Sequence, residues 1–110
     1  MGYLIKNKNV EIADSLFVVG EKALIASKDI DKNTIVFLYE DTATNERTRT
    51  SIQVAIDKHI EPGEFGAFAN HSCSPNSQVI ANYDEESNQA TVLMLTIETI
   101  HKGDEITFDY

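Results

Sequence analysis

The sequence predicts a single, mostly β domain built from short strands. No window of twelve or more residues carries an amphipathic helical period. Short apolar runs, several of them rich in β-branched residues, alternate instead with polar turns. At 110 residues, 42% of them apolar and 25% charged, the chain has the length and composition for one hydrophobic core. We therefore expect residues 1–110 to form one domain.

The expected strands follow from the apolar runs in order. They cover residues 3–5, 16–19, 35–39, 50–56, 78–83, 91–97 and 106–110, with a further apolar run at 23–26. Because side chains alternate along a strand, Ile35, Phe37 and Tyr39 should share one face. The polar segment 40–48 has no periodicity and is predicted to be a loop. Pro62-Gly63-Glu64 should break the chain before an apolar approach at 65–69.

Two segments resemble each other weakly. Residues 30–39 and 100–110 each contain a lysine-bearing turn followed by the strand pattern Ile-x-Phe-x-Tyr. Over so few positions chance can produce the same match. If the likeness is structural, it predicts two similar hairpins that could face each other, each ending in a tyrosine.

Charge and composition narrow the class of partner. Nine basic and eighteen acidic residues give a net charge of −9, which argues against direct binding to nucleic acid. That charge suits a basic partner such as a lysine-rich peptide, although acidity that merely maintains solubility explains it more simply. One cysteine excludes an internal disulfide, and no apolar run approaches the length of a membrane span. With no secretory signal either, we expect an intracellular protein without a membrane anchor.

The chemically richest stretch is Asn-His-Ser-Cys-Ser-Pro-Asn at residues 70–76. Seven residues bring together two amides, an imidazole, a thiol and two hydroxyl groups at the end of an apolar approach. Polar groups in such a place must find partners, because burying them unpaired is costly. The partners are either the backbone of the protein itself or a ligand.

Catalysis by a cysteine nucleophile and metal binding both find little support. His71 could serve as a base for Cys73, but no glycine-rich turn or helix start surrounds the thiol to lower its pKa. A buried structural cysteine is the better interpretation. The spacing of His59, His71, His101 and Cys73 matches no zinc pattern. No metal site is expected.

The polar stretch together with Tyr39 and Tyr110 offers a third chemistry. Neutral tyrosine hydroxyls and backbone carbonyls beside an aromatic ring suit a cation, or a group that is losing its charge. Two tyrosines at strand ends on the edge of the core explain the same residues without a ligand. The residues alone leave both interpretations open.

Two motifs resemble the signature pair of the SET-domain lysine methyltransferases. They are the stretch at 70–76 and the sequence Gly-Asp-Glu-Ile-Thr-Phe-Asp-Tyr at 103–110, in the same order. Residues 26–39 also resemble the first conserved unit of that family, and residues 65–69 resemble its approach to the Asn-His pair. The likeness extends over roughly residues 16–110.

The resemblance implies a SET-domain, β-clip-like fold of small curved sheets, in which the segment around Asn70 and the C-terminal motif cross in a pseudoknot. Residues 72–76 would then hold the crossing, with Cys73 as a packing residue. It also implies S-adenosyl-L-methionine as cofactor and a lysine of a histone or another protein as substrate. Asn70 and His71 would hold the cofactor.

The lysine side of the site follows from the same likeness. It implies that Tyr110 positions the lysine amine and the methyl group and also lies against the cofactor. Tyr39 would line the same channel, and Phe108 would influence how many methyl groups fit. Because Phe108 lacks a hydroxyl group, the family trend favours di- or trimethylation. Methyl transfer to a neutral amine depends mainly on orientation and a dry channel, and it requires no strong acid, base or metal.

The chain departs from the family pattern at three places. The insert between Tyr39 and the approach to the Asn-His pair is short, which leaves little to recognise a substrate sequence. Gly20, Glu21, Lys22 and Ala23 occupy the cofactor-binding stretch in which the family usually has Gly-x-Gly, so side chains here could hinder close approach of the cofactor. The sequence also ends at Tyr110, without the tail that closes the lysine channel in many relatives. A homodimer whose partner closes the site, a chain that lacks residues, and weak activity are alternatives. A non-catalytic module that binds a peptide or protein is the alternative function.

Overall fold

The computed structural model describes residues 2–15, 19–48, 51–61, 63–72 and 74–109. These residues form ten strands and one short helix, which confirms the mostly β fold. The elements are β1 (Gly2–Lys6), β2 (Val10–Asp14), β3 (Lys22–Ala26), β4 (Ile35–Thr42), β5 (Ile52–Ala55), β6 (Lys58–Ile60), α1 (Gly63–Phe68), β7 (Asn70–His71), β8 (Ser77–Asp84), β9 (Gln89–Thr96) and β10 (Thr107–Asp109).

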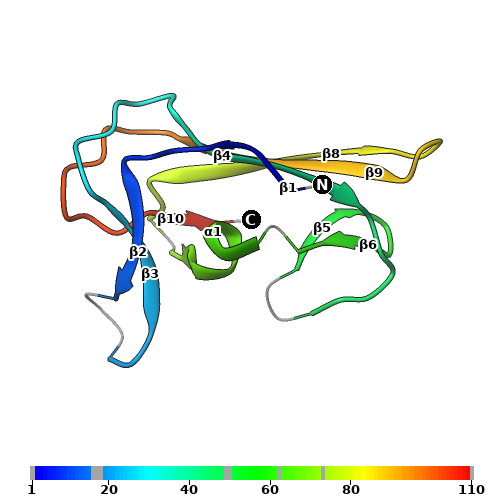
Figure 1. The fold of residues 1–110 in the computed structure, drawn as a ribbon, viewed down its shortest axis with the longest axis horizontal. Coiled ribbons are helices and arrows are strands. Elements are labelled where there is room, and N and C mark those ends of the chain that lie inside the picture. The colour runs from blue at the N-terminus through cyan, green and yellow to red at the C-terminus, as the bar shows by residue number, and fades with distance from the viewer. Residues whose placement is uncertain (1, 16–18, 49–50, 62, 73, 110) are drawn as a thin grey trace.

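Six strands form the main sheet, in the order β1-β4-β9-β8-β10-β7. The strands β2 and β3 form one separate hairpin, and β5 and β6 form another. Figure 1 shows the long strands of the sheet crossing the molecule, with the two hairpins at opposite ends and α1 and β10 between them. Strand β10, the last described element, lies in that central region of the view.

The centre of the sheet is an antiparallel pair, β8 and β9, whose sequences alternate as predicted. Buried and half-buried residues alternate along β9, so that Ala90, Val92, Met94 and Thr96 all face the core. A turn at 85–88 joins the two strands. The predicted strands at 78–83 and 91–97 are therefore confirmed, each with bounds shifted by a residue or two.

The C-terminal strand crosses the segment that follows Asn70. Strand β10 lies between β7 and β8 and runs parallel to both of them. Since β7 and β8 are consecutive in the sequence, the residues that join them must pass across β10. This is the pseudoknot that the family resemblance implied.

The two similar segments do face each other. Ile30 and Ile100 form an antiparallel bridge, and each donates its N–H to the carbonyl of the other at 2.8 Å. The lysine-bearing turns are thus paired, whereas the tyrosine that ends the second segment lies outside the described residues.

The face predicted for strand 35–39 was partly wrong. A bulge in the pairing of β4 with β9 sets Ile35 opposite Leu95 but Phe37 opposite Met94. One extra residue in a strand reverses the direction of the side chains beyond it. Phe37 and Tyr39 therefore share the core face, and Ile35 lies on the other face.

Three other boundaries differ from the sequence prediction. Strand β4 continues into the expected loop, because residues 40–42 pair with residues 89–91 of β9. The chain is helical from Gly63, where only a break was expected. Of the predicted strand 16–19, Val19 lies fully exposed in a turn and the other residues are outside the described part. The strand in this region is β2.

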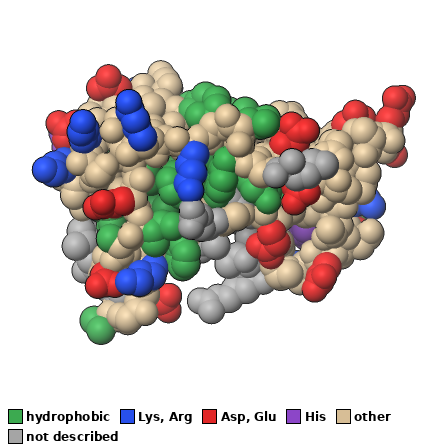
Figure 2. All heavy atoms as spheres, viewed as in Figure 1, with side chains coloured by type: hydrophobic (Ala, Val, Ile, Leu, Met, Phe, Trp, Pro, Cys, Tyr) green, Lys and Arg blue, Asp and Glu red, His purple; other side chains and the backbone are tan. Residues whose placement is uncertain are grey.

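One cluster of buried side chains forms the core. Its fully buried members are contributed by β3, β4, β9 and the segment before β10: Leu24, Val36, Phe37, Val92, Met94, Ile100 and Ile106. Figure 2 shows hydrophobic side chains near the middle of one face, lysine and arginine gathered at one end, and acidic side chains at the tip of the β8–β9 hairpin. In the described part of the chain, no helix is long and apolar enough to cross a membrane.

Candidate functional site

Asn70, the first residue of the predicted cofactor pair, lies on β7 and contacts a buried carboxylate. Its Nδ2 donates a hydrogen bond to the Glu105 Oε1 at 2.7 Å. The other carboxylate oxygen, Oε2, accepts a hydrogen bond from the Ser15 hydroxyl at 3.2 Å. Only 6% of Glu105 is exposed. His71 follows in β7, where its backbone is paired with Phe108.

The rest of the polar stretch holds the crossing of the chain. Asn76 uses both ends of its amide for this: Nδ2 donates to the Glu105 carbonyl at 2.8 Å, and Oδ1 accepts from the Thr107 N–H at 2.9 Å. The Ser72 N–H donates to the Phe108 carbonyl at 2.9 Å. Asn76 and Ser72 thus have partners in the backbone of the C-terminal motif. Cys73 lies outside the described residues.

Residues 20–23, which replace the family's Gly-x-Gly, span the end of the loop between β2 and β3 and the start of β3. The Ser15 N–H donates to the Glu21 carbonyl at 2.8 Å, which closes the base of that loop. Gly20 has a φ of +83°, and a Cβ placed there would meet no atom within 4 Å. A side chain at this position would therefore be opposed by the backbone conformation and not by crowding.

Lys22 and Ala23, the first two residues of β3, differ in their burial. The Lys22 ammonium donates to the Asp14 carboxylate across the hairpin at 2.7 Å, and this hydrogen bond and charge lower the pKa of Asp14. Ala23 is fully buried in the core. Of the four predicted cofactor-binding residues here, Gly20, Glu21 and Lys22 are exposed, whereas Ala23 is buried and is paired with Ala13 of β2.

Strand β3 and the C-terminal motif are joined directly. Ile25 forms an antiparallel bridge with Glu105, and the Ile106 N–H donates to the Leu24 carbonyl at 2.8 Å. Glu105 therefore links three segments: β3 through its backbone, the end of β2 through Ser15, and β7 through Asn70. Asn70 contacts this carboxylate directly, whereas residues 20–23 are connected to it only through Ser15, whose N–H donates to the Glu21 carbonyl.

The residues predicted for the lysine channel are more widely separated. Phe108 is 8% exposed and belongs to the core cluster, whereas Tyr39 is half-buried and packs against the same cluster. Their strands, β10 and β4, have β8 and β9 between them in the sheet. Tyr110, the proposed positioning tyrosine, lies outside the described residues.

The Tyr39 hydroxyl donates to the Asp41 Oδ2 at 3.4 Å. Partial burial, and secondly the negative charge of Asp41, raise the pKa of Tyr39 above its usual value. Both causes disfavour the phenolate. The hydroxyl therefore stays protonated and neutral at physiological pH.

Comparison with known proteins decides the family. The SET domain family model matches residues 21–110, most of the chain. The chain belongs to the SET domain family. It is 29% identical over 105 residues to a Candida albicans histone-lysine N-methyltransferase specific for lysine 36 of histone H3, and the match covers 79% of this chain. It is 36% identical over 50 residues, 44% of this chain, to the mouse histone-lysine N-methyltransferase SUV39H2.

The chain matches only a small part of each of these relatives, 12% of the fungal protein and 10% of the mouse protein. A solved structure supports the fold independently. A candidate histone methyltransferase from Plasmodium falciparum superimposes with a TM-score of 0.71 and 23% identity, covering 94% of both chains. At this identity the likeness establishes the SET fold.

Two contacts of the SET domain were not anticipated from the sequence. The sequence places Glu105 in the second motif. Nothing in the sequence indicates that Ser15 and Asn70 are the hydrogen-bond partners of its carboxylate. Tyr3 had no sequence signal at all. Both Tyr3 and Ser15 precede the region that matches the SET family model.

Tyr3 connects the tyrosine of β4 to the helix that leads to Asn70. Its ring lies edge-on to Tyr39 with 5.1 Å between centroids, and 5.8 Å from the centroid of Phe65 on α1. Its hydroxyl accepts a hydrogen bond from the Phe65 N–H at 2.7 Å. The Lys6 ammonium lies 5.3 Å from the Tyr3 ring centroid and 4.9 Å from that of Phe65.

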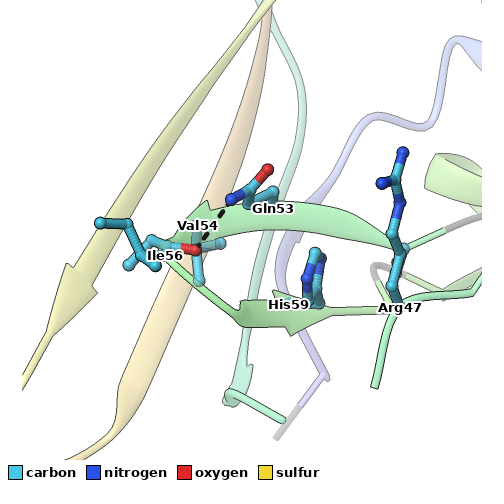
Figure 3. Close-up of a pocket in the computed structure, with 7 residues that line it drawn as sticks. Arg47, Gln53, Val54, Ile56 and His59 are labelled. Carbon is cyan, nitrogen blue, oxygen red and sulfur yellow. Dashed lines mark hydrogen bonds between the residues drawn. The ribbon is translucent and has the colours of Figure 1, made fainter. Parts of the chain in front are cut away.

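A separate open pocket of about 580 Å³ lies at the β5–β6 hairpin, away from Glu105. Figure 3 shows His59 and Gln53 rising from its two strands, with Arg47 beside the hairpin. The residues that line it are Arg47, Ser51, Gln53, Val54, Ala55, Ile56 and His59. None of the predicted site residues is among them. Within the described part of the chain, no three His, Cys, Asp or Glu residues are grouped as metal ligands.

Proposed function

We propose that this SET domain transfers methyl groups from S-adenosyl-L-methionine to the ε-amine of a lysine in a histone or another protein. The observation that carries the proposal is the junction at Glu105, where Asn70 and the β2–β3 loop meet. The resemblance assigns Asn70 to the cofactor, together with residues 20–23, which follow Ser15 in that loop and are bonded to it through the Glu21 carbonyl. Membership of the SET family and the names of the relatives support the same reaction.

The residues present fit such a cofactor on its polar side. The Asn70 amide gives its N–H to Glu105, which leaves the carbonyl oxygen Oδ1 as an acceptor for a ligand N–H group. The exposed residues Gly20, Glu21 and Lys22 would lie along the ligand, with the buried Ala23 beneath them, and His71 would hold it beside Asn70. Bound there, the cofactor supplies a methyl group activated by a sulfonium.

The protein contributes orientation and exclusion of water on the lysine side. Tyr110 would position the amine, Tyr39 would line the channel as a neutral hydroxyl, and the ring of Phe108 would limit its width. Because Phe108 offers no hydroxyl to hold a water molecule, we propose di- or trimethylation. The reacting amine must be neutral when it attacks, and a dry aromatic channel favours the neutral form.

The proposed substrate is a basic, lysine-containing peptide segment. The −9 charge of the chain would attract such a segment and repel nucleic acid. The relatives are named for histone lysines, so a histone tail in the nucleus is one concrete candidate. A homodimer in which a partner completes the site also stays a proposal, which sedimentation velocity would test.

Isothermal titration calorimetry with S-adenosyl-L-methionine tests the function. Binding is expected at micromolar to millimolar cofactor, and no detectable heat at millimolar concentration would exclude the enzyme. Once binding is established, Tyr110→Phe should lower methyl transfer to a lysine peptide by roughly 10- to 100-fold, while cofactor affinity changes little, since removing one hydrogen bond made in the transition state has that cost. Equal loss of affinity and rate would contradict the role of Tyr110.

The alternative is a SET domain that binds a peptide or protein without catalysis. It predicts peptide binding that is independent of S-adenosyl-L-methionine and no transfer of labelled methyl groups. Membership of the SET family and the names of the relatives favour the enzyme.

A further inference from the structure

We infer that Glu105 is a positioning residue, which fixes the orientation of the Asn70 amide so that its oxygen faces the cofactor. The inference rests on the proposed function and extends it to a residue that does not itself contact the reacting groups. It is carried by the 2.7 Å hydrogen bond from the Asn70 Nδ2 to the Glu105 Oε1 and by the burial of that carboxylate.

An ionised carboxylate can only accept hydrogen bonds, so it selects one of the two orientations of a neighbouring amide. With Glu105 opposite, the NH₂ group of Asn70 must face the carboxylate, and Oδ1 must face away. Among the described residues, none donates a hydrogen bond to this oxygen. Asn70 thus presents an acceptor of fixed direction, which suits an N–H or ammonium group of the ligand.

Glu105 can fix the orientation of the Asn70 amide because its own carboxylate and backbone are fixed by other hydrogen bonds. Its Oε2 accepts from the Ser15 hydroxyl, and its carbonyl accepts from the Asn76 Nδ2 at 2.8 Å. Its backbone is bridged to Ile25. No lysine or arginine of the described chain forms a salt bridge with it. The hydrogen bonds of the buried carboxylate therefore come from neutral groups, of which Asn70 is one.

A purely structural role would give the same contacts, so the test must separate the two. We compare the affinity for S-adenosyl-L-methionine, by calorimetry, with the melting temperature and with the KM for a lysine peptide. Glu105→Ala should weaken cofactor binding about tenfold or more, because hydrogen bonds to charged groups carry at least that much. Glu105→Gln should stay within about threefold, since its amide oxygen still accepts from Asn70 and its NH₂ can face the Ser15 hydroxyl.

If Glu105→Ala fails to fold, variants that exchange the amide and the carboxylate between positions 70 and 105 provide a second test. Asn70→Asp sets two carboxylates against each other and should weaken cofactor binding at least tenfold. Adding Glu105→Gln lets the new amide donate to one oxygen of the carboxylate introduced at position 70, while the second oxygen still faces the ligand as an acceptor. The double variant should recover most of the affinity. Asn82→Ala, at an exposed residue of β8 that makes no contact with Glu105, is the control and should change affinity by less than about threefold.

The outcomes distinguish the inference from the proposed function. If the wild-type protein binds the cofactor and Glu105→Ala binds it equally well, the inference is overturned and the function stands. The same holds if the double variant binds no better than Asn70→Asp alone, or if the peptide KM rises in parallel with the cofactor Kd. Absence of cofactor binding by the wild-type protein would overturn both.

Discussion

Two asparagines of one polar stretch, Asn70 and Asn76, have different tasks because their amides meet different partners. Asn76 faces a backbone N–H and a backbone carbonyl, so both ends of its side chain are satisfied within the fold. Asn70 faces a carboxylate that satisfies only its NH₂ group. The sequence showed that the stretch needs partners, but only the family resemblance separated the two roles. The partners themselves are 29 to 35 residues away in the chain.

At the same scale, Tyr39 should make stability depend on alkaline pH. Its folded-state pKa is raised by partial burial and by Asp41. The stabilisation from a raised pKa is fully present below the unfolded-state pKa, which is about 10 for tyrosine, and is lost as pH rises through the folded value. Urea denaturation at pH 7, 9 and 10.5 should therefore show a loss of stability at the highest pH that is smaller in Tyr39→Phe.

The difference between wild type and variant isolates Tyr39 from the other groups that titrate in this range. Tyr83→Phe is the control, because its hydroxyl bonds to the neutral side chain of Asn88 and not to a carboxylate. Equal alkaline losses in wild type and Tyr39→Phe would show that the ionisation of this hydroxyl is not linked to folding.

At the scale of elements, the strands predicted best were those in which core-facing and outward-facing residues alternate along the whole strand. β8 and β9 alternate along their whole length and are joined by a polar turn. β2 was missed because its Val-Glu-Ile-Ala-Asp sequence is short and mixed, and its stability comes from pairing with β3. The bulge in β4 is equally invisible in sequence, since it depends on the register with β9.

The contact between β1 and α1 can be tested at the first residue of the helix. Gly63 has a φ of +73°, and a Cβ there would lie 2.9 Å from the Tyr3 hydroxyl. Gly63→Ala should therefore cost more than backbone strain alone, about 2 to 3 kcal/mol of unfolding free energy, because Tyr3 and its bond to Phe65 must shift. Denaturant titration measures the loss.

Gly103→Ala is the matched control for this prediction. Gly103 has a φ of +91°, but a Cβ there would meet no atom within 4 Å. It should cost about 1 kcal/mol, the strain alone. If the two variants are equally destabilised, Tyr3 does not constrain the start of α1.

Considered as a whole, the molecule uses its first twenty residues to support a SET domain whose family match begins at residue 21. Tyr3 supports α1, and Ser15 bonds to the carboxylate that holds Asn70. The two motifs at 70–76 and 103–110 supplied the predicted site residues in the second half of the chain. These N-terminal contributions could not be predicted, because each depends on a contact across more than 60 residues.

The crossing of β10 should contribute strongly to the stability of the whole domain. Asn76→Ala removes both bonds of the side chain to Glu105 and Thr107, and leaves a carbonyl and an N–H without partners. We expect a loss of roughly 2 to 4 kcal/mol in unfolding free energy, a large fraction of the total for a domain of this size. Circular dichroism during urea titration measures it.

Asn82→Ala provides the comparison, because Asn82 is exposed on β8, toward the end of the strand that does not pair with β10. It should change stability by less than about 0.5 kcal/mol. An equally small effect of Asn76→Ala would mean that water replaces its side chain at the crossing.

The position of β10 between β7 and β8 also couples ligand binding to the local opening of the chain. Within the described residues, β7 pairs only with β10, so Asn70 cannot leave the sheet without disturbing the C-terminal strand. The two strands should therefore open and close as one cooperative unit. A ligand held at Asn70 would slow hydrogen exchange at Ser72 and Thr107, whose N–H groups bond across the crossing, although neither amide touches the ligand.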